Sequence, residues 1–271
     1  MDNRITHERI KQHLHYDWFK YVVFVVLCVF VFSLAYTWSG NYRAFEELDI
    51  FVTCYSYMDD DFKEDALKYL NKNCSNNVVK VIGVSHISAI SGSWGESLNA
   101  MAMNDRTSFL ILPESQMENY ASTFLCMYSV SAGSHKVNTE IWNAIMPDEL
   151  KENYAVPDNI NDYVERMAAA SDDEQLQEIK KEANAENDNL YFDKGNRGIG
   201  VYGIRVDNLY DITRIRFKSD RPDLYPDEKY YLVMHYNNHN SGSYGYTEKL
   251  SEHYESFALV KFFLTRYGVP Q

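Results

Sequence analysis

The runs "LDIFVTC" (Leu48–Cys54) and "VVKVIGV" (Val78–Val84) decide the fold of this chain of 271 residues. Both are short, mostly apolar and rich in β-branched residues, which is typical of buried strands. The segment between them carries apolar residues from Phe62 to Leu70 that fall on one face of a helix, with three aspartates before its first turn. Strand, helix and strand in so short a segment predict a βαβ unit with parallel strands and a right-handed crossover.

The same pattern continues in the following residues. A serine-rich loop leads to Ser93-Trp94-Gly95-Glu96, which has the serine and glutamate spacing of a capping box at a helix start. The run "SFLIL" (Ser108–Leu112) predicts a third strand, which Pro113 ends because proline has no amide hydrogen to donate. A second capping box at Ser115–Glu118, and apolar residues at helical spacing as far as Tyr128, predict another helix. The sequence therefore predicts an α/β domain that begins with a βαβαβ part.

An apolar run from Trp18 to Trp38 precedes this domain. It is 21 residues long, close to the roughly 20 that a helix needs to cross a bilayer, and it has tryptophan and tyrosine at both ends. Four basic residues precede its apolar core at Tyr21–Ala35 and only Arg43 closely follows the run, which predicts a cytoplasmic N-terminus. The alternative is a cleaved signal peptide, because Ser33-Leu34-Ala35 fits a cleavage site. The long charged lead favours an uncleaved anchor, so we expect a single-pass cell-membrane protein with its C-terminal domain outside.

These patterns divide the chain into segments. They are a cytoplasmic tail (1–17), a transmembrane helix (18–38), a linker (39–47), the first part of the extracellular domain (48–130), an acidic, mostly helical insertion (131–197), and returning strands with a C-terminal helix (198–271). The last segment holds three strand-like runs, at 198–206, 211–217 and 229–236, before a well-buried final helix.

Charge and cysteine content limit the class of protein. The formal net charge is −13, and residues 147–190 hold 13 acidic residues against four basic ones. A surface of this sign argues against binding to nucleic acid. Beyond the apolar run the cysteines are Cys54, Cys74 and Cys126, an odd number without a C-x-x-C pair. This favours free thiols over a disulfide framework, with one disulfide left open.

The order and the amino-acid sequence of these runs resemble the first lobe of extracellular solute-binding proteins. The resemblance is to the type II periplasmic-binding-protein class, which serves bacterial ABC importers. The resemblance rests on "LDIFVTC", "VVKVIGV" and "SFLILPESQMENYA", and later on "VYGIRV" and "EKYYLVMHYNN". It covers residues 46–130 and 198–267 and is closest to a shortened, membrane-anchored variety seen in Clostridia-like Gram-positive bacteria. It implies a single lobe in which the small helical insertion replaces most of the second lobe, because residues 131–197 are too few and too polar to build an equal one.

Open parallel sheets bind ligands at the carboxyl ends of their strands, where polar residues gather in this sequence. The candidate ligand-binding residues are Tyr55, Ser56, Ser91, Ser93, Trp94, Glu114, Ser115, His235 and Asn237. Helix capping alone explains Ser93 and Ser115 equally well. His235 and His239 have H-x-x-x-H spacing but leave a strand for a polar loop, which disfavours zinc, so we predict no metal site and no cofactor.

The chain has no nucleophile elbow, no P-loop and no zinc-protease motif, so the sequence does not indicate an enzyme. We expect instead a membrane-anchored extracellular domain that recognises a small ligand or a membrane-protein partner, with association with an ABC importer as one version. The alternative is a non-enzymatic interaction or assembly subunit with a degenerate ligand cleft. Its acidic segment at 147–190 would meet a partner, although a solvated face explains that acidity equally well.

Overall fold

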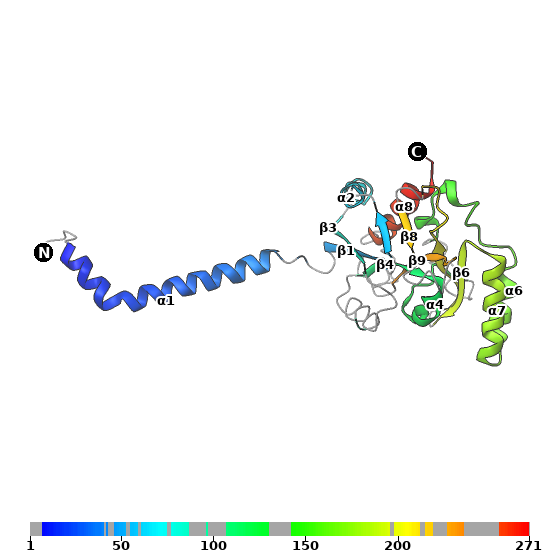
Figure 1. Ribbon diagram of the computed structural model, residues 1–271, viewed down its shortest axis with the longest axis horizontal. Coiled ribbons are helices and arrows are strands. Elements are labelled where there is room, and N and C mark those ends of the chain that lie inside the picture. Colours follow the sequence, from blue (N-terminus) through cyan, green and yellow to red (C-terminus); the bar gives the residue numbers. More distant parts are fainter. Residues whose placement is uncertain are drawn as a thin grey trace. The chain divides into compact units, whose positions relative to one another are not determined.

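A computed structural model describes the fold in residues 7–40, 42, 46–52, 55–58, 61–74, 77–86, 96, 107–129, 142–195, 198–211, 215–218, 227–235 and 255–270. The chain divides into two units, Met1–Arg43 and Ala44–Gln271. The first unit contains one long helix, and the second contains all the strands described below (Figure 1).

Helix α1 (His7–Gly40) confirms the apolar helix that the sequence predicts at Trp18–Trp38. Within it, His15–Tyr36 is long and apolar enough to cross a membrane, and no part of this stretch is buried inside the protein. A signal sequence meets the same criteria, so the anchor and its orientation stay predictions.

The second unit is built on a seven-stranded mixed sheet in the order β3-β1-β4-β9-β7-β5, with β6 also pairing with β7. Strand β1 pairs in parallel with both β3 and β4, which confirms the parallel arrangement that the sequence predicts for its first three strands. Strand β9 runs antiparallel to β4, and β7 runs antiparallel to its neighbours. The strands are β1 (Glu47–Val52), β3 (Val81–His86), β4 (Thr107–Pro113), β5 (Tyr128–Ser129), β6 (Leu190–Gly195), β7 (Gly198–Arg205) and β9 (Tyr230–Met234).

Alternate residues of the central strands enter separate apolar clusters. In β4, Phe109 and Ile111 join the larger cluster, whereas Leu110 and Leu112 join the smaller one. Successive side chains of a strand point to opposite faces, so both faces of the sheet are covered. Helices α2 (Phe62–Asn73) and α8 (Glu255–Gly268) contribute to the larger cluster, and α4 (Glu114–Tyr120) contributes to the smaller one (Figure 1).

The helix predicted to run from Ser115 to Tyr128 is wrong beyond α4. After one 3₁₀ turn, η2 (Ala121–Thr123), the chain becomes extended. The amide of Leu125 donates to the carbonyl of Met234 (2.7 Å), and that of Met127 donates to the carbonyl of Val201 (2.9 Å). These long-range bonds place the segment between β9 and β7, so sheet pairing outweighs the local helical spacing of its apolar residues.

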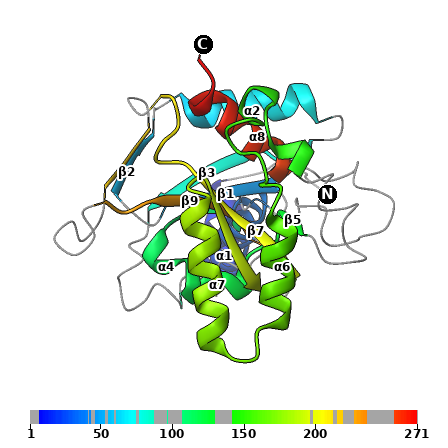
Figure 2. The same cartoon turned by 90° about the vertical axis from the view of Figure 1, so that its right-hand side faces the viewer.

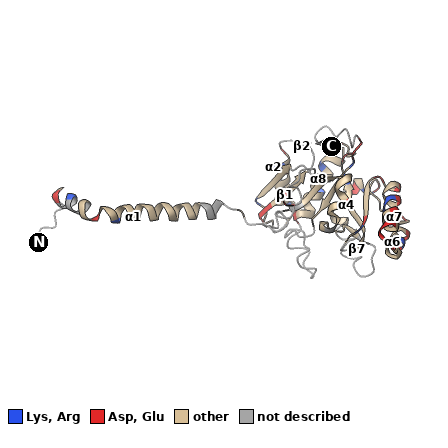
Figure 3. Ribbon diagram, turned by 60° about the horizontal axis from the view of Figure 1, so that its bottom comes forward, with Lys and Arg blue, Asp and Glu red and all other residues tan. Residues whose placement is uncertain are grey.

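The acidic segment forms a helical hairpin, with α6 (Ile160–Ala169) beside α7 (Asp173–Glu186) in Figure 2. The short η3 (Asp148–Leu150) precedes it. Each helix buries three side chains, while acidic residues lie along both helices (Figure 3). Strand β6 also falls within the range 131–197 that the sequence assigns to the insertion, yet it belongs to the main sheet.

Two side chains of α7 bind strand β6. The amide of Asn184 donates to the carbonyl of Phe192 (3.1 Å) and accepts from its N–H (2.7 Å), as a neighbouring strand would. One turn earlier, Nζ of Lys180 lies 2.8 Å from Oδ1 of Asp193, and both side chains are more than nine-tenths buried. Because residues four apart share a helix face, these contacts together fix α7 along β6.

Cys74 and Cys126 are buried and neither is in a disulfide, as the sequence favours for these two residues. The Cys126 thiol donates to the carbonyl of Tyr128 (3.3 Å). Cys54 lies outside the described residues.

Candidate ligand-binding site at the sheet edge

One edge of the sheet gathers the ends of four strands. The last residue of β4, Pro113, pairs with Tyr230 at the start of β9. Arg205, at the end of β7, pairs with Tyr231, and Leu190 at the start of β6 pairs with Ile204. Since β4 runs parallel to β1, this is the carboxyl edge of the parallel strands, where open sheets bind ligands.

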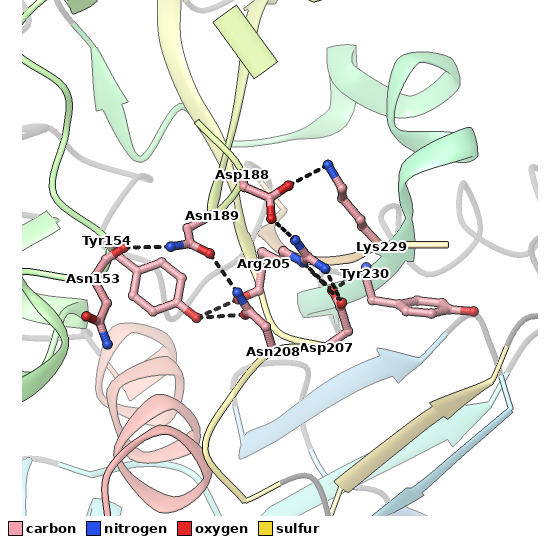
Figure 4. A network of polar contacts seen from close by, with 9 residues as sticks. All are labelled: Asn153, Tyr154, Asp188, Asn189, Arg205, Asp207, Asn208, Lys229 and Tyr230. Atoms are coloured by element: carbon pink, nitrogen blue, oxygen red, sulfur yellow. Dashed lines mark hydrogen bonds and ion pairs between the residues drawn. The ribbon is translucent and has the colours of Figure 1, made fainter. Parts of the chain in front are cut away.

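Arg205 is the centre of an ion-pair network at this edge (Figure 4). Its guanidinium binds Asp207 through Nε (3.1 Å to each carboxylate oxygen) and Nη2 (2.8 Å), and it also pairs with Asp188. Lys229 lies 2.7 Å from Asp188, and its hydrogen bond lowers the pKa of that carboxyl. Asp207 also accepts the N–H of Tyr230 (2.9 Å). The network therefore joins the end of β7 to the starts of β6 and β9.

A neutral hydrogen-bond chain continues from this network. The hydroxyl of Tyr154 lies 2.9 Å from the carbonyl of Arg205 and 3.2 Å from Oδ1 of Asn208. Nδ2 of Asn208 donates to Oδ1 of Asn189 (2.6 Å), whose own Nδ2 donates to the carbonyl of Asn153 (2.8 Å). Burial raises the pKa of Tyr154, so its hydroxyl stays a donor at neutral pH.

These neutral side chains line a cleft of about 360 Å³. Its floor includes the buried Leu150 and Leu209, which close over Gly268, where a Cβ atom would lie 2.7 Å from Cδ1 of Leu150. Tyr210 also lines the cleft and is 68% exposed, whereas most aromatic residues described in this unit are buried. The polar residues that line it are Glu149, Asn153, Tyr154, Asn189, Asn208 and Tyr210.

The structure places the sequence candidates in several locations. Tyr55 and Ser56 follow β1, as expected, and belong to a further strand, β2 (Tyr55–Met58), which pairs with β8 (Ile215–Lys218) in a separate two-stranded sheet. Ser91, Ser93, Trp94 and Asn237 lie outside the described residues. Glu114 lies half-buried at the carboxyl edge, where its N–H donates to the carbonyl of Lys229 (2.9 Å).

The capping box predicted at Ser115 and Glu118 is wrong. Helix α4 begins at Glu114, and the N–H of Ser115 donates to Oε1 of Glu228 (2.9 Å). The side chain of Glu118 instead reaches Lys180 (3.3 Å). A carboxylate distant in sequence takes the free amide because strand pairing holds Lys229 beside the helix start.

His235 lies at the other end of the strands from Glu114. It follows β9, bridges to Phe124 and is only 1% exposed. It lies five residue steps after Tyr230, or about 17 Å at the usual rise of a strand. His235 and Glu114 therefore do not form one site.

The cleft residues were missed by sequence reasoning, although a short repeat marks them. Asp188-Asn189-Leu190-Tyr191 and Asp207-Asn208-Leu209-Tyr210 have the same four residues, the first running into the start of β6 and the second following β7. Both aspartates pair with Arg205, and the two asparagines bind each other. Antiparallel pairing of β6 with β7 brings the two copies together.

The arrangement can bind a ligand through hydrogen bonds. Arg205 and Lys229 are paired with the two aspartates, and the Tyr154 hydroxyl is held protonated. The other polar groups of the described lining are three amides, the Tyr210 hydroxyl and the Glu149 carboxylate, which can donate to or accept from a ligand. A scan of protein-family models and a search of curated proteins find no match to this chain.

Proposed function

We propose that this chain is a membrane-anchored protein whose α/β domain binds a small polar ligand in the cleft beside Arg205. The observation that carries the proposal is the cleft itself, whose volume of about 360 Å³ falls within the range of small-molecule sites, roughly 300–1,000 Å³. Six of its ten described lining residues are polar, so it is more polar than most small-molecule sites, which favours a ligand with several polar groups.

The polar groups are held in position by the protein alone. Asn208 is bound by Asn189, and the single proton of the Tyr154 hydroxyl is shared between Oδ1 of Asn208 and the carbonyl of Arg205. Ordering flexible side chains on binding costs free energy, so side chains already ordered favour affinity. The ion pairs of Arg205 support this arrangement, because they hold together the ends of the two strands beside which Asn189 and Asn208 lie.

Two further features support the proposal. The site lies beside the carboxyl edge of the parallel strands, as in the solute-binding proteins that the sequence resembles. The apolar helix α1 and the basic residues before it favour an anchored domain outside the cell with a cytoplasmic N-terminus. Delivery of the ligand to an importer is one use of such a domain.

Thermal unfolding of the full chain in detergent micelles, with pools of small polar compounds, tests the proposal. We expect at least one pool to raise the melting temperature, because a ligand that binds only the folded state stabilises it. Asn208→Ala should abolish that shift. Asn119→Ala is the matched control, since Asn119 is also exposed but its amide binds Gln116 on α4. A chain that no pool stabilises, or a shift that survives in Asn208→Ala, would refute the cleft as the ligand site.

The interaction-subunit hypothesis keeps one supporting observation, the exposed acidic residues of the α6–α7 hairpin (Figure 3). Deleting the hairpin is a poor test because Asn184 and Lys180 bind strand β6. Changing the exposed Glu165, Glu174 and Glu178 together to glutamine preserves those contacts. We expect these substitutions to remove proteins that co-purify with the membrane-extracted wild type if the hairpin is an interface, and unchanged co-purification would exclude that role.

A further inference from the structure

The paired asparagines at the cleft retain unused hydrogen-bonding capacity. An asparagine amide has two N–H donors and two acceptor lone pairs on its oxygen. In the described contacts, Asn189 and Asn208 each donate one N–H and accept one hydrogen bond. Each therefore retains one donor and one acceptor lone pair. Asn153 contributes a third amide, which Figure 4 shows turned away from this pair.

Adjacent donors and acceptors match a ligand whose groups both donate and accept. Hydroxyl groups do this, whereas carboxylates and phosphates only accept and ammonium groups only donate. The charged residues in and near the cleft also favour an uncharged ligand. The described residues that line the cleft include no lysine or arginine, and Arg205 and Lys229 nearby are paired with Asp207 and Asp188. An anion would find no free cation among the lining residues, and a cation would find the single carboxylate of Glu149.

Tyr210 adds an apolar surface to these amides. It lines the cleft while 68% exposed, so its ring is available to a ligand without any rearrangement of the core. Aromatic rings at binding sites cover the apolar face of a ligand while neighbouring polar groups fix its orientation. A sugar ring has such a C–H face, with hydroxyls around its rim. The cleft holds roughly 12 waters at ~30 Å³ each, which is room for one such ring.

We propose that the cleft binds an uncharged polyhydroxylated ligand, a saccharide or a polyol, with Tyr210 against its C–H face and the asparagine amides on its hydroxyls. This inference rests on the proposed function of the cleft and specifies the ligand class. The duplicated Asp-Asn-Leu-Tyr segments give it a structural basis, because the aspartates clamp Arg205 and thereby set the two asparagines side by side.

Saturation-transfer NMR on the full chain tests the ligand class. The protein must be held in nanodiscs or in a detergent without a sugar head group, because alkyl glucosides and maltosides would themselves compete for the cleft. The probes are glucose, galactose, cellobiose, myo-inositol and sorbitol, set against glycine, glutamate, spermidine and inorganic phosphate. Tyr210→Ala, Tyr210→Phe and Asn153→Ala are the variants, with Asn119→Ala as control; these side chains are exposed, so the variants should fold.

We expect at least one saccharide or polyol to bind. Tyr210→Ala should weaken it about tenfold, or ~1.4 kcal/mol, whereas Tyr210→Phe and Asn119→Ala should not. Asn153→Ala should weaken it by a smaller factor. If a charged probe binds in a Tyr210-dependent way and no polyol does, the ligand class is wrong while the cleft remains a binding site. If no probe binds, or if binding ignores both Tyr210→Ala and Asn153→Ala, the ligand class and the proposed function both fail.

Discussion

Replacing Lys180 with alanine should destabilise the domain far more than replacing its neighbour Lys181. Lys180 and Asp193 are 2.8 Å apart, with side chains 8% and 3% exposed. At an effective dielectric constant of about 20 their attraction is roughly 6 kcal/mol before the cost of desolvation. The second contact of Lys180, with Glu118 at 3.3 Å, adds little because that carboxylate is 53% exposed.

Removing one partner of a buried ion pair typically costs about 3–5 kcal/mol, because the other charge stays buried alone. We expect this loss in Lys180→Ala. Asp193 would keep only the N–H of Lys194 as a partner for Oδ1, and its Oδ2 has no hydrogen bond among the described residues. Removing both charges together, in Lys180→Met with Asp193→Leu, should return stability to within about 2 kcal/mol of the wild type.

Urea-induced unfolding of the full chain in micelles, followed by tryptophan fluorescence, measures these differences. Trp142 is buried and lies edge-on to Tyr128, so it reports on the folded domain. Lys181→Ala is the control, because Lys181 is exposed on the same helix. Free energies of unfolding that agree within about 0.5 kcal/mol for Lys180→Ala and Lys181→Ala would refute the reasoning. A double variant as unstable as Lys180→Ala would refute it too.

Three further predictions are tested by the same urea-induced unfolding. Glu228→Ala should cost about 0.5–2 kcal/mol by uncapping α4, whereas Ser115→Ala should cost less than about 0.5 kcal/mol; the reverse order would restore the predicted capping box. Gly83→Ala should cost about 1–3 kcal/mol, because its Cβ would lie 1.7 Å from Oδ1 of Asp49, and unchanged stability would mean that Asp49 turns aside freely. Burial, aided by a hydrogen bond with a neighbouring glutamate, raises the pKa of Tyr163 to about 12. Because the pKa is higher in the folded state, protonated Tyr163 contributes fully to the free energy of unfolding below about pH 10. This contribution is lost between about pH 10 and pH 12, so Tyr163→Phe should make the loss of stability in that range smaller.

The parts of the fold that sequence predicts well are those that depend on neighbouring residues. The apolar runs around Ile50 and Ile82 and the helical face of Phe62 lie close together in sequence, and handedness rules then limit their arrangement. The end of α4 was missed because Leu125 and Met127 are paired by strands about 75 to 110 residues away. Helical spacing among apolar residues cannot reveal such a partner.

The candidate site was difficult to predict for a related reason. Glu114 does lie at the carboxyl edge of the sheet, because the order of parallel strands sets that edge. The cleft beside it depends on Asn189 and Asn208, which are brought together by the antiparallel pairing of β6 with β7. The range assigned to a helical insertion hid β6, so the duplicated Asp-Asn-Leu-Tyr segments could not be recognised as neighbours.

The two hydrogen bonds of Asn184 with Phe192 have a consequence for solubility. A strand at the end of a sheet invites pairing with the same strand of another molecule, and this leads to aggregation. Here a side chain occupies the place that an incoming backbone would take. Loosening α7 would therefore uncover a template for fibre growth. Variants that weaken the contacts of α7 with β6 should precipitate during expression at temperatures where the rest of the domain stays folded.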